Sequence, residues 1–301
     1  MGSKRFPLRR GFERLFGARL MPYLLHLRPL EWPIMSAHFL LGSLMACGWP
    51  LPGRNTLLGW FIFVVLLNGG TLAINSAFDQ DEGDIGYLKA PPKPPPHLLP
   101  LSALMLAAAL GLGFLLPPAF AWANAACVTM SILYSVPPPR LKARAGWDLL
   151  INMVGFGALT PLAGWGISGR ALPPWFLGVA AGFALLFGAL YPATQIYQIE
   201  EDRARGDRTL VIRFGEAASL WAAVLLAVLA HLLFAWSLRA GGRGDLLPWT
   251  LPSLGAWLAV LLPWCLRWRG MSQHRHEAGM YWALAAWAVT DLSLLALFWP
   301  R

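Results

Sequence analysis

The sequence has few charged residues. Only 13% of its 301 residues carry charge, against about 25% in a typical soluble domain. Apolar residues make up 57%, and the mean hydropathy is +0.52. A single soluble core could not bury this much apolar surface, so the composition excludes an ordinary soluble domain and favours a polytopic membrane protein.

Cysteine is scarce as well. Cys47, Cys127 and Cys265 each lie alone in an apolar run, so neither a disulfide framework nor a zinc site is indicated. No short apolar stretch near the N-terminus precedes a small-residue cleavage site, and we expect no cleavable signal peptide. Residues 1–31 are basic instead. They are expected to form a surface-lying amphipathic helix or, equally, a solvated tail.

Long apolar stretches fill the rest of the chain. Their lengths and composition are those of membrane-spanning helices, and Pro, Gly or charged residues separate them. We therefore predict an all-α fold in which residues 32–301 form one bundle of nine transmembrane helices around a central cavity. The predicted spans are 32–50, 57–78, 98–116, 119–136, 147–166, 174–197, 217–238, 248–267 and 279–299.

The distribution of Lys and Arg predicts the orientation. With the N-terminus in the cytoplasm, 19 of the 24 Lys and Arg residues lie in inner segments and five in outer ones. Positive residues favour the cytoplasmic side of a membrane protein. The same bias, together with anionic lipid headgroups, accounts for the net charge of +9, so no nucleic-acid partner is indicated.

Acidic residues are the rarest charged class, yet they cluster. Of 15 in the chain, eight fall in two short windows, both on the predicted cytoplasmic side. The first window closes the second span and the second follows the sixth. Together they contain Asp79, Asp81, Glu82, Asp84, Glu200, Glu201, Asp202 and Asp207.

Each window continues a polar stripe within a span. Asn68, Asn75 and Asp79 fall on one helix face, and so do Tyr191, Gln195, Gln198 and Asp202. Polar stripes inside membrane helices are unfavourable unless they face one another or a water-filled cavity. The two helices are therefore expected to turn toward a common pocket.

Carboxylates at such a pocket suit a hard cation. Mg²⁺ takes oxygen ligands, typically one or two carboxylates together with substrate phosphates. Cationic side chains on neighbouring cytoplasmic loops could complete a diphosphate clamp. They are Arg140, Lys142 and Arg144 on one loop, and Arg203, Arg205 and Arg208 on the other. A transporter is the other interpretation of these intramembrane polar residues, but the spans themselves carry few charges.

Four motifs together resemble the UbiA superfamily of intramembrane prenyltransferases. They are Leu27-Arg28-Pro29-Leu30-Glu31-Trp32, the Asn75-x-x-x-Asp79 window, Tyr134-Ser135-Val136-Pro137-Pro138-Pro139-Arg140-Leu141-Lys142, and Glu201-Asp202-x-x-x-Gly206-Asp207-Arg208-Thr209-Leu210. Their order and the nine-span pattern extend the resemblance over nearly the whole chain. It implies a helical bundle around a cavity that holds Mg²⁺ and the diphosphate of an isoprenyl donor.

The resemblance also implies roles for individual residues. The catalytic set is Asn75, Asp79, Lys142 and Asp202, and the metal ligands are expected among Asn75, Asp79, Asp81, Asp84, Glu200, Glu201 and Asp202. The diphosphate is expected to contact Tyr134, Arg140, Lys142, Gln198 and Arg208. The sequence departs from the usual family pattern at Ser76, Gly83 and Gln198, where family members often have acidic residues.

The resulting prediction is a Mg²⁺-dependent enzyme of a bacterial or archaeal plasma membrane, with its active site on the cytoplasmic side. It transfers an isoprenyl group, through an allylic carbocation, from a diphosphate donor to a lipophilic acceptor. The acceptor could be a quinone precursor, a tetrapyrrole, a glycerol phosphate or a carotenoid. A membrane terpene cyclase is the alternative with the same site, and a transporter the less favoured one.

Overall fold

Helices make up most of the protein. The computed structural model describes residues 17, 19–49, 51, 53–80, 88 and 91–298. Residues 19–26 are helical. The longer helices are α2 (Trp32–Cys47), α3 (Gly53–Trp60), α4 (Gly69–Asp79), α5 (Leu98–Gly113), α6 (Pro118–Ser135), α9 (Pro174–Ile196), α12 (Glu216–Ala240), α13 (Leu251–Arg267) and α14 (Gln273–Phe298).

Shorter helical elements join or extend these helices. The 3₁₀ turns are η1 (Pro29–Glu31), η3 (Leu141–Ala143) and η5 (Gly244–Thr250), and the short α-helices are α7 (Trp147–Asn152), α8 (Thr160–Gly166), α10 (Ile199–Ala204) and α11 (Leu210–Phe214). π-helical turns η2 (Phe61–Asn68) and η4 (Met153–Leu159) connect α3 to α4 and α7 to α8. The described ranges contain an isolated β-bridge between Arg144 and Arg208 but no strand.

The all-α prediction is therefore confirmed, and helices occupy the predicted apolar segments. In the described part of the chain, five helices are long and apolar enough to cross a membrane: Gly53–Asp79, Trp147–Gly166, Pro174–Ile196, Glu216–Ala240 and Gln273–Ala296. Two further apolar helices, Leu98–Gly113 and Leu251–Arg267, are shorter. Nine crossings, a cytoplasmic N-terminus and a separate role for residues 1–31 stay predictions.

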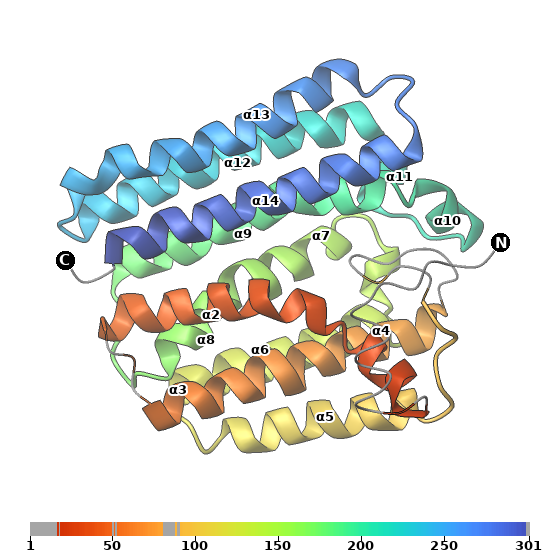
Figure 1. Ribbon diagram of the computed structural model, residues 1–301, viewed down its shortest axis with the longest axis horizontal. Helices are drawn as coiled ribbons and strands as arrows, with labels where there is room; N and C mark the ends of the chain where they lie inside the picture. The colour runs from red at the N-terminus through yellow and green to blue at the C-terminus, as the bar shows by residue number, and fades with distance from the viewer. Residues whose placement is uncertain are drawn as a thin grey trace.

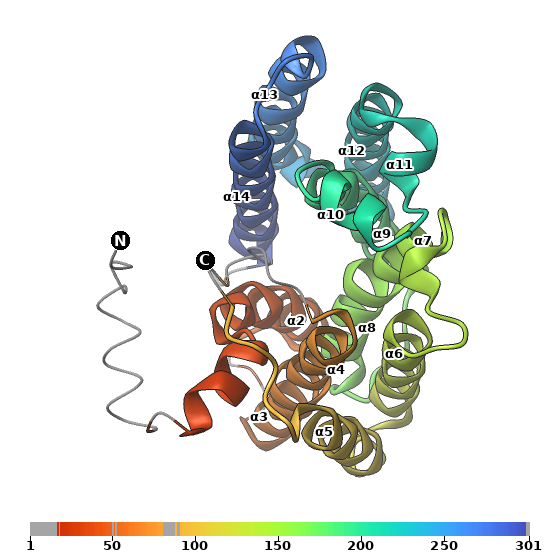
Figure 2. The ribbon, with the colours of Figure 1, turned by 90° about the vertical axis from the view of Figure 1, so that its right-hand side faces the viewer.

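Two hydrophobic clusters hold the helices together. The first joins α9, α12, α13 and α14 to one end of α2, and the second joins α2, η2, α5, α6 and α8. In Figure 1 these two groups occupy the upper and lower halves of the molecule. Viewed along the helices in Figure 2, they surround the middle of the bundle. Helices α2 and α8 contribute side chains to both clusters and therefore connect the two halves.

Two glycines allow α2 and α8 to pack closely. A Cβ at Gly42 would lie 2.0 Å from the Pro161 carbonyl oxygen, and one at Gly164 would lie 1.9 Å from the Phe39 carbonyl oxygen. Only residues without a side chain permit such a backbone approach, which is common between membrane helices. Ser43 adds a hydrogen bond of 2.9 Å to the Gly164 carbonyl oxygen. This contact fixes α2 as one wall of the cavity described next.

Candidate functional site

A cavity of about 340 Å³ lies between the two halves of the bundle. Side chains from α2, α4, α6, α9 and α14 and from both π-helical turns line it. Its mouth is polar, whereas its interior is apolar and aromatic. The interior residues include Met35, Phe63, Leu67, Phe156, Phe187 and Trp287. Since π-helical turns are frequent at functional sites, their position along this cavity supports its importance.

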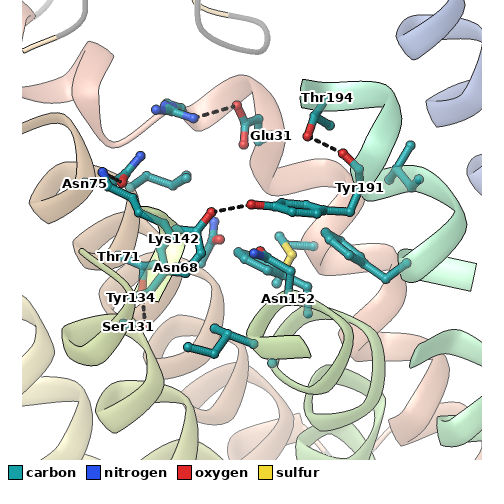
Figure 3. A pocket seen from close by; sticks show the side chains of 18 of the residues that line it. Glu31, Asn68, Thr71, Asn75, Ser131, Tyr134, Lys142, Asn152, Tyr191 and Thr194 are labelled. Atoms are coloured by element: carbon teal, nitrogen blue, oxygen red, sulfur yellow. Dashed lines mark hydrogen bonds and ion pairs between the residues drawn. The ribbon is translucent and has the colours of Figure 1, made fainter. Parts of the chain in front are cut away.

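Both predicted polar stripes face the cavity. Asn68, Asn75 and Asp79 line it from one side, and Tyr191, Gln195, Gln198 and Asp202 from the other. Helical periodicity places each set on one face, and the bundle turns the two faces toward each other. Figure 3 shows Asn68, Thr71 and Asn75 on one side of the cavity and Tyr191 and Thr194 on the opposite side. The prediction of a common pocket is confirmed.

The Asp79 side of the mouth is built from residues far apart in the sequence. Lys142 Nζ donates a hydrogen bond of 2.7 Å to Asn75 Oδ1 and forms an ion pair with Asp79. The side chains of Lys142 and Asp79 are only 9% and 7% exposed. Ser135 Oγ also donates to Asn75 Oδ1, at 3.3 Å. An amide, a carboxylate and an ammonium group therefore meet at one sheltered point.

The opposite side contains a second group of charges. Arg205 Nη2 lies 2.5 Å from Asp202 Oδ1, and Arg205 Nε lies 3.3 Å from Asp207 Oδ2. Arg140 connects the two sides, because its guanidinium contacts Asp207 at 2.5 Å and Asp79 at 3.4 Å. The mouth is thus one network that extends from Asp79 to Asp202.

The charges of this network balance. Three carboxylates face three cationic side chains, Arg140, Lys142 and Arg205. Burial works to lower the pKa of Arg140, but the hydrogen bond and charge of Asp207 and the charge of Asp79 outweigh it, so the pKa is raised. Arg140 is therefore permanently positive. A diphosphate with its metal ions could bind within this network without upsetting the charge balance. The carboxylates would then bind metal, and the cationic side chains would bind phosphate oxygens.

A buried carboxylate positions the two loops that carry these charges. Asp148 is fully buried and accepts hydrogen bonds from Gly146 N at 2.8 Å, Gln195 Nε2 at 2.7 Å and Leu210 N at 3.0 Å. Arg208 N donates to the Ala143 carbonyl oxygen at 3.1 Å. The loop after α6 and the loop after α10 are therefore tied together, which keeps Arg140 and Lys142 beside Asp207 and Asp79.

Two tyrosines meet where the polar mouth gives way to the apolar interior. The hydroxyls of Tyr134 on α6 and Tyr191 on α9 lie 2.9 Å apart, as Figure 3 shows. Asn152 lines the same region. This contact joins two walls of the cavity and separates the charged compartment from the aromatic one.

His38 is a polar residue in the wall of the cavity. Its Nε2 lies 3.2 Å from the Gly157 carbonyl oxygen, and its Nδ1 lies 3.5 Å from Asp291 Oδ1. Trp287 Nε1 donates to Asp291 Oδ2 at 3.1 Å. These contacts connect α2, η4 and α14. They match the packing role that isolated polar residues usually have between membrane helices.

The donor set at the mouth fits Mg²⁺ held jointly by protein and phosphate. Asn75, Asp79 and Asp202 all present oxygen atoms, the ligand type that Mg²⁺ prefers, and one or two carboxylates per ion are usual. Among the described residues no group of three or more His, Cys, Asp and Glu side chains is arranged to hold a metal. The oxygen donors of Asn75, Asp79 and Asp202 therefore fit an ion that also binds phosphate oxygens.

The other residues predicted for the site differ in how close they lie to the mouth. Glu200 is 78% exposed and pairs with Arg203, while Glu201 and Arg208 are outside the cavity lining. Arg140 is not a lining residue either but reaches the mouth through its contacts. Tyr134 lines the cavity at the tyrosine contact rather than within the ion-pair network. Asp81 and Asp84 lie outside the described residues.

The structure places at the mouth some motif residues for which the sequence predicted no role in the site. Asp207 bonds to two arginines of the network, although its motif position had drawn attention to Arg208 instead. Arg28 and Glu31 also line the cavity and lie 3.7 Å apart. Both residues belong to the motif Leu27–Trp32, which is the feature of the sequence that points to them.

Comparisons with known proteins identify a family and several relatives. The model of the UbiA prenyltransferase family matches residues 35–298. A lycopene elongase/hydratase from Haloferax volcanii is 28% identical over 225 residues, which cover 73% of each chain.

Two solved structures show the same fold. A UbiA homologue from Archaeoglobus fulgidus, bound to GPP and Mg²⁺, is 20% identical and superposes with a TM-score of 0.71 over 92% of this chain and 99% of the other. A structure of digeranylgeranylglyceryl phosphate synthase is 18% identical, with a TM-score of 0.68 over 93% and 98% of the two chains.

Proposed function

Because the chain belongs to the UbiA prenyltransferase family, we propose that it transfers an isoprenyl group from its diphosphate to a hydrophobic acceptor in this cavity. One observation carries the proposal. A charge-balanced mouth of carboxylates and cationic groups opens directly into an apolar, aromatic interior. A diphosphate suits the first compartment, and a prenyl chain suits the second. The A. fulgidus homologue that was solved with GPP and Mg²⁺ supports the pairing of these ligands.

The mouth residues have distinct tasks in this proposal. Asn75, Asp79 and Asp202 would hold Mg²⁺, which supplies positive charge that stabilises the departing diphosphate. Lys142 and Arg205 bind phosphate oxygens, and Arg140 shares its charge between Asp79 and Asp207. The C1–O bond of the donor breaks, and its electron pair leaves with the diphosphate oxygen. Preorganised cationic groups near that oxygen lower the barrier, because they are already in place when its charge develops.

The interior protects and directs the allylic cation. Aromatic ring faces attract cations, and Phe156, Phe187 and Trp287 supply such rings along the wall. The Phe156 and Phe187 rings stack with centroids 5.5 Å apart. A cavity that excludes water favours attack by the acceptor, whose carbon forms the new bond to C1 and then loses a proton.

The nature of the acceptor is suggested by the H. volcanii relative. That protein's name describes elongation of lycopene, a polyene without polar groups. An apolar interior is suited to such an acceptor, and we therefore place a long unsaturated hydrocarbon first among the candidates. Nine membrane crossings with the mouth on the cytoplasmic side complete the proposal, since a charged donor would then reach Lys142 and Asp79 from the cytoplasm.

The test is a turnover assay on the purified full-length protein. Dimethylallyl, geranyl and geranylgeranyl diphosphates would each be incubated with Mg²⁺, with and without acceptors that include a polyene, a quinone precursor and a glycerol phosphate. Diphosphate release that needs both Mg²⁺ and an acceptor, with a prenylated product, supports the proposal. Release without acceptor and with a cyclic hydrocarbon would identify a terpene cyclase instead. No Mg²⁺-dependent turnover with any donor would overturn both.

A further inference from the structure

A second cavity lies at the other end of the bundle. Its volume is about 330 Å³, and the ends of α2 and α12 form part of its wall. Figure 1 shows these ends on the left, away from α10 and α11. None of its lining residues belongs to the first cavity. Along α2, Glu31 and Ala46 are on the order of 20 Å apart at 1.5 Å per residue, so the two cavities are separate sites.

Two arginines distinguish this cavity from an ordinary packing defect. Arg170 and Arg243 both line it. Arg170 Nη1 donates a hydrogen bond of 2.5 Å to the Ala46 carbonyl oxygen at the end of α2. This bond uses one of the five N–H donors of a guanidinium group. The backbone N–H of Arg243 donates to the Leu238 carbonyl oxygen at 2.7 Å, which fixes Arg243 close to the end of α12.

The surroundings place these arginines at the level of lipid headgroups. Trp175 lines the cavity, and two exposed tryptophans, Trp49 and Trp236, adjoin lining residues in the sequence. Tryptophan at the ends of apolar helices is typical of the membrane–water interface. The lining also contains the apolar side chains of Leu44, Met45 and Leu238. The cavity therefore combines two cationic side chains with apolar ones, next to tryptophans of the kind found at the membrane interface.

We propose that this cavity binds the phosphate group of an anionic phospholipid. Guanidinium groups recognise phosphate oxygens through paired hydrogen bonds, and the apolar wall offers contact to the start of an acyl chain. A soluble phosphate would use the arginines but not Leu44, Met45 or Leu238, which is why we assign the ligand to a lipid. The site is independent of the reaction proposed above, because no residue that lines it touches the first cavity.

The test uses the delipidated full-length protein in detergent and measures bound lipid by native mass spectrometry. Phosphatidylglycerol and phosphatidylcholine would be added at equal concentrations. The wild-type protein is expected to retain the anionic lipid about tenfold better, and Arg243→Gln should remove most of that preference. Arg239→Gln is the matched control, because Arg239 lies at the same end of α12, is exposed and does not line the cavity. It should retain the lipid within about twofold of the wild type.

Several outcomes would decide the proposal. Equal retention of both lipids, or wild-type retention in Arg243→Gln and in the Arg170→Gln/Arg243→Gln double variant, would overturn it. Binding of inorganic phosphate without retention of phosphatidylglycerol would overturn the assignment to a lipid. Displacement of retained phosphatidylglycerol by inorganic phosphate would support the proposal, because it would show that the lipid is held through its phosphate group. Arg170→Gln also removes a hydrogen bond to the end of α2, so the double variant could fail to fold. In that case the result for Arg243→Gln alone decides the proposal. Prenyl transfer in detergent should be unchanged in Arg243→Gln.

Discussion

The two sides of the cavity mouth are built in different ways. Asp79 obtains its cationic partners from a distant loop, where Lys142 and Arg140 lie more than 60 residues away in the sequence. Asp202 is paired within its own helical turn by Arg205, three residues later. The first arrangement exists only when the bundle is assembled, whereas the second can form in an isolated segment. The comparison shows that the Asp79 side depends on tertiary structure and the Asp202 side on local geometry.

The largest expected effect is loss of a carboxylate on either side. Asp79→Asn and Asp202→Asn keep the size of the side chain but remove its charge, so each should lower kcat/KM by about 10³-fold if both sides hold metal and diphosphate together. The rate of diphosphate release at varied Mg²⁺ measures this, and size-exclusion chromatography checks that each variant is folded. If only Asp79→Asn lost activity, the two sides would not form one site.

Lys142 tests the side that depends on tertiary structure. Lys142→Met keeps a long, flexible side chain but removes the ammonium group, and it leaves Asp79 and Asn75 without this partner. We expect a loss of about 100-fold in kcat/KM. Lys142→Arg should recover part of it, because the charge is restored while the geometry differs. Arg208→Gln is the control, since Arg208 is exposed and outside the lining. A loss as large in Arg208→Gln would contradict this account of the mouth.

Two neighbouring arginines test the Asp202 side of the mouth. Arg205 lines the cavity and pairs with Asp202 and Asp207, whereas Arg203, one half-turn away, pairs with exposed Glu200. We expect Arg205→Gln to raise the KM for the donor about tenfold, because one phosphate contact is lost. Arg203→Gln should change it by less than about twofold, because exposed ion pairs contribute little. The KM values are measured by steady-state kinetics. Equal increases in KM for the two variants would show that α10 rotates when the donor binds, so that Arg203 also reaches the diphosphate.

Much of the cavity could be predicted from the sequence. Helical periodicity determines which side chains share a face, so the stripes ending in Asp79 and Asp202 were sufficient to predict two facing walls. The loop motif around Arg140 and Lys142 likewise indicated cationic partners for those walls. These features depend on spacing within one element, and spacing is visible in a sequence.

Features that depend on how loops fold were not visible. Gly206 adopts a positive φ of 74°, a conformation that glycine adopts readily. The turn it permits brings Asp207 N to the Asp202 carbonyl oxygen, 3.0 Å away. Asp207 therefore joins the network, and Arg208 instead forms a backbone bridge with Arg144. The hydrogen bonds of Asp148 depend on the fold in the same way, because two of its three donors, Gln195 and Leu210, are far from it in the sequence.

The smallest expected effect concerns Glu200, which the sequence had placed among the metal ligands. Its side chain is exposed and paired with Arg203 in the structure, so Glu200→Gln should leave both kcat and the Mg²⁺ dependence within about twofold of the wild type. The comparison with Asp202→Asn is direct, because the two residues lie on the same short helix but on different faces. A Mg²⁺ titration of both variants measures the difference. A clear rise in the Mg²⁺ concentration needed for half-maximal activity of Glu200→Gln would mean that α10 rotates when metal and diphosphate bind. The Asp202 side of the mouth would then change conformation when the ligands bind, whereas the Asp79 side, which is held by Lys142, would stay in place.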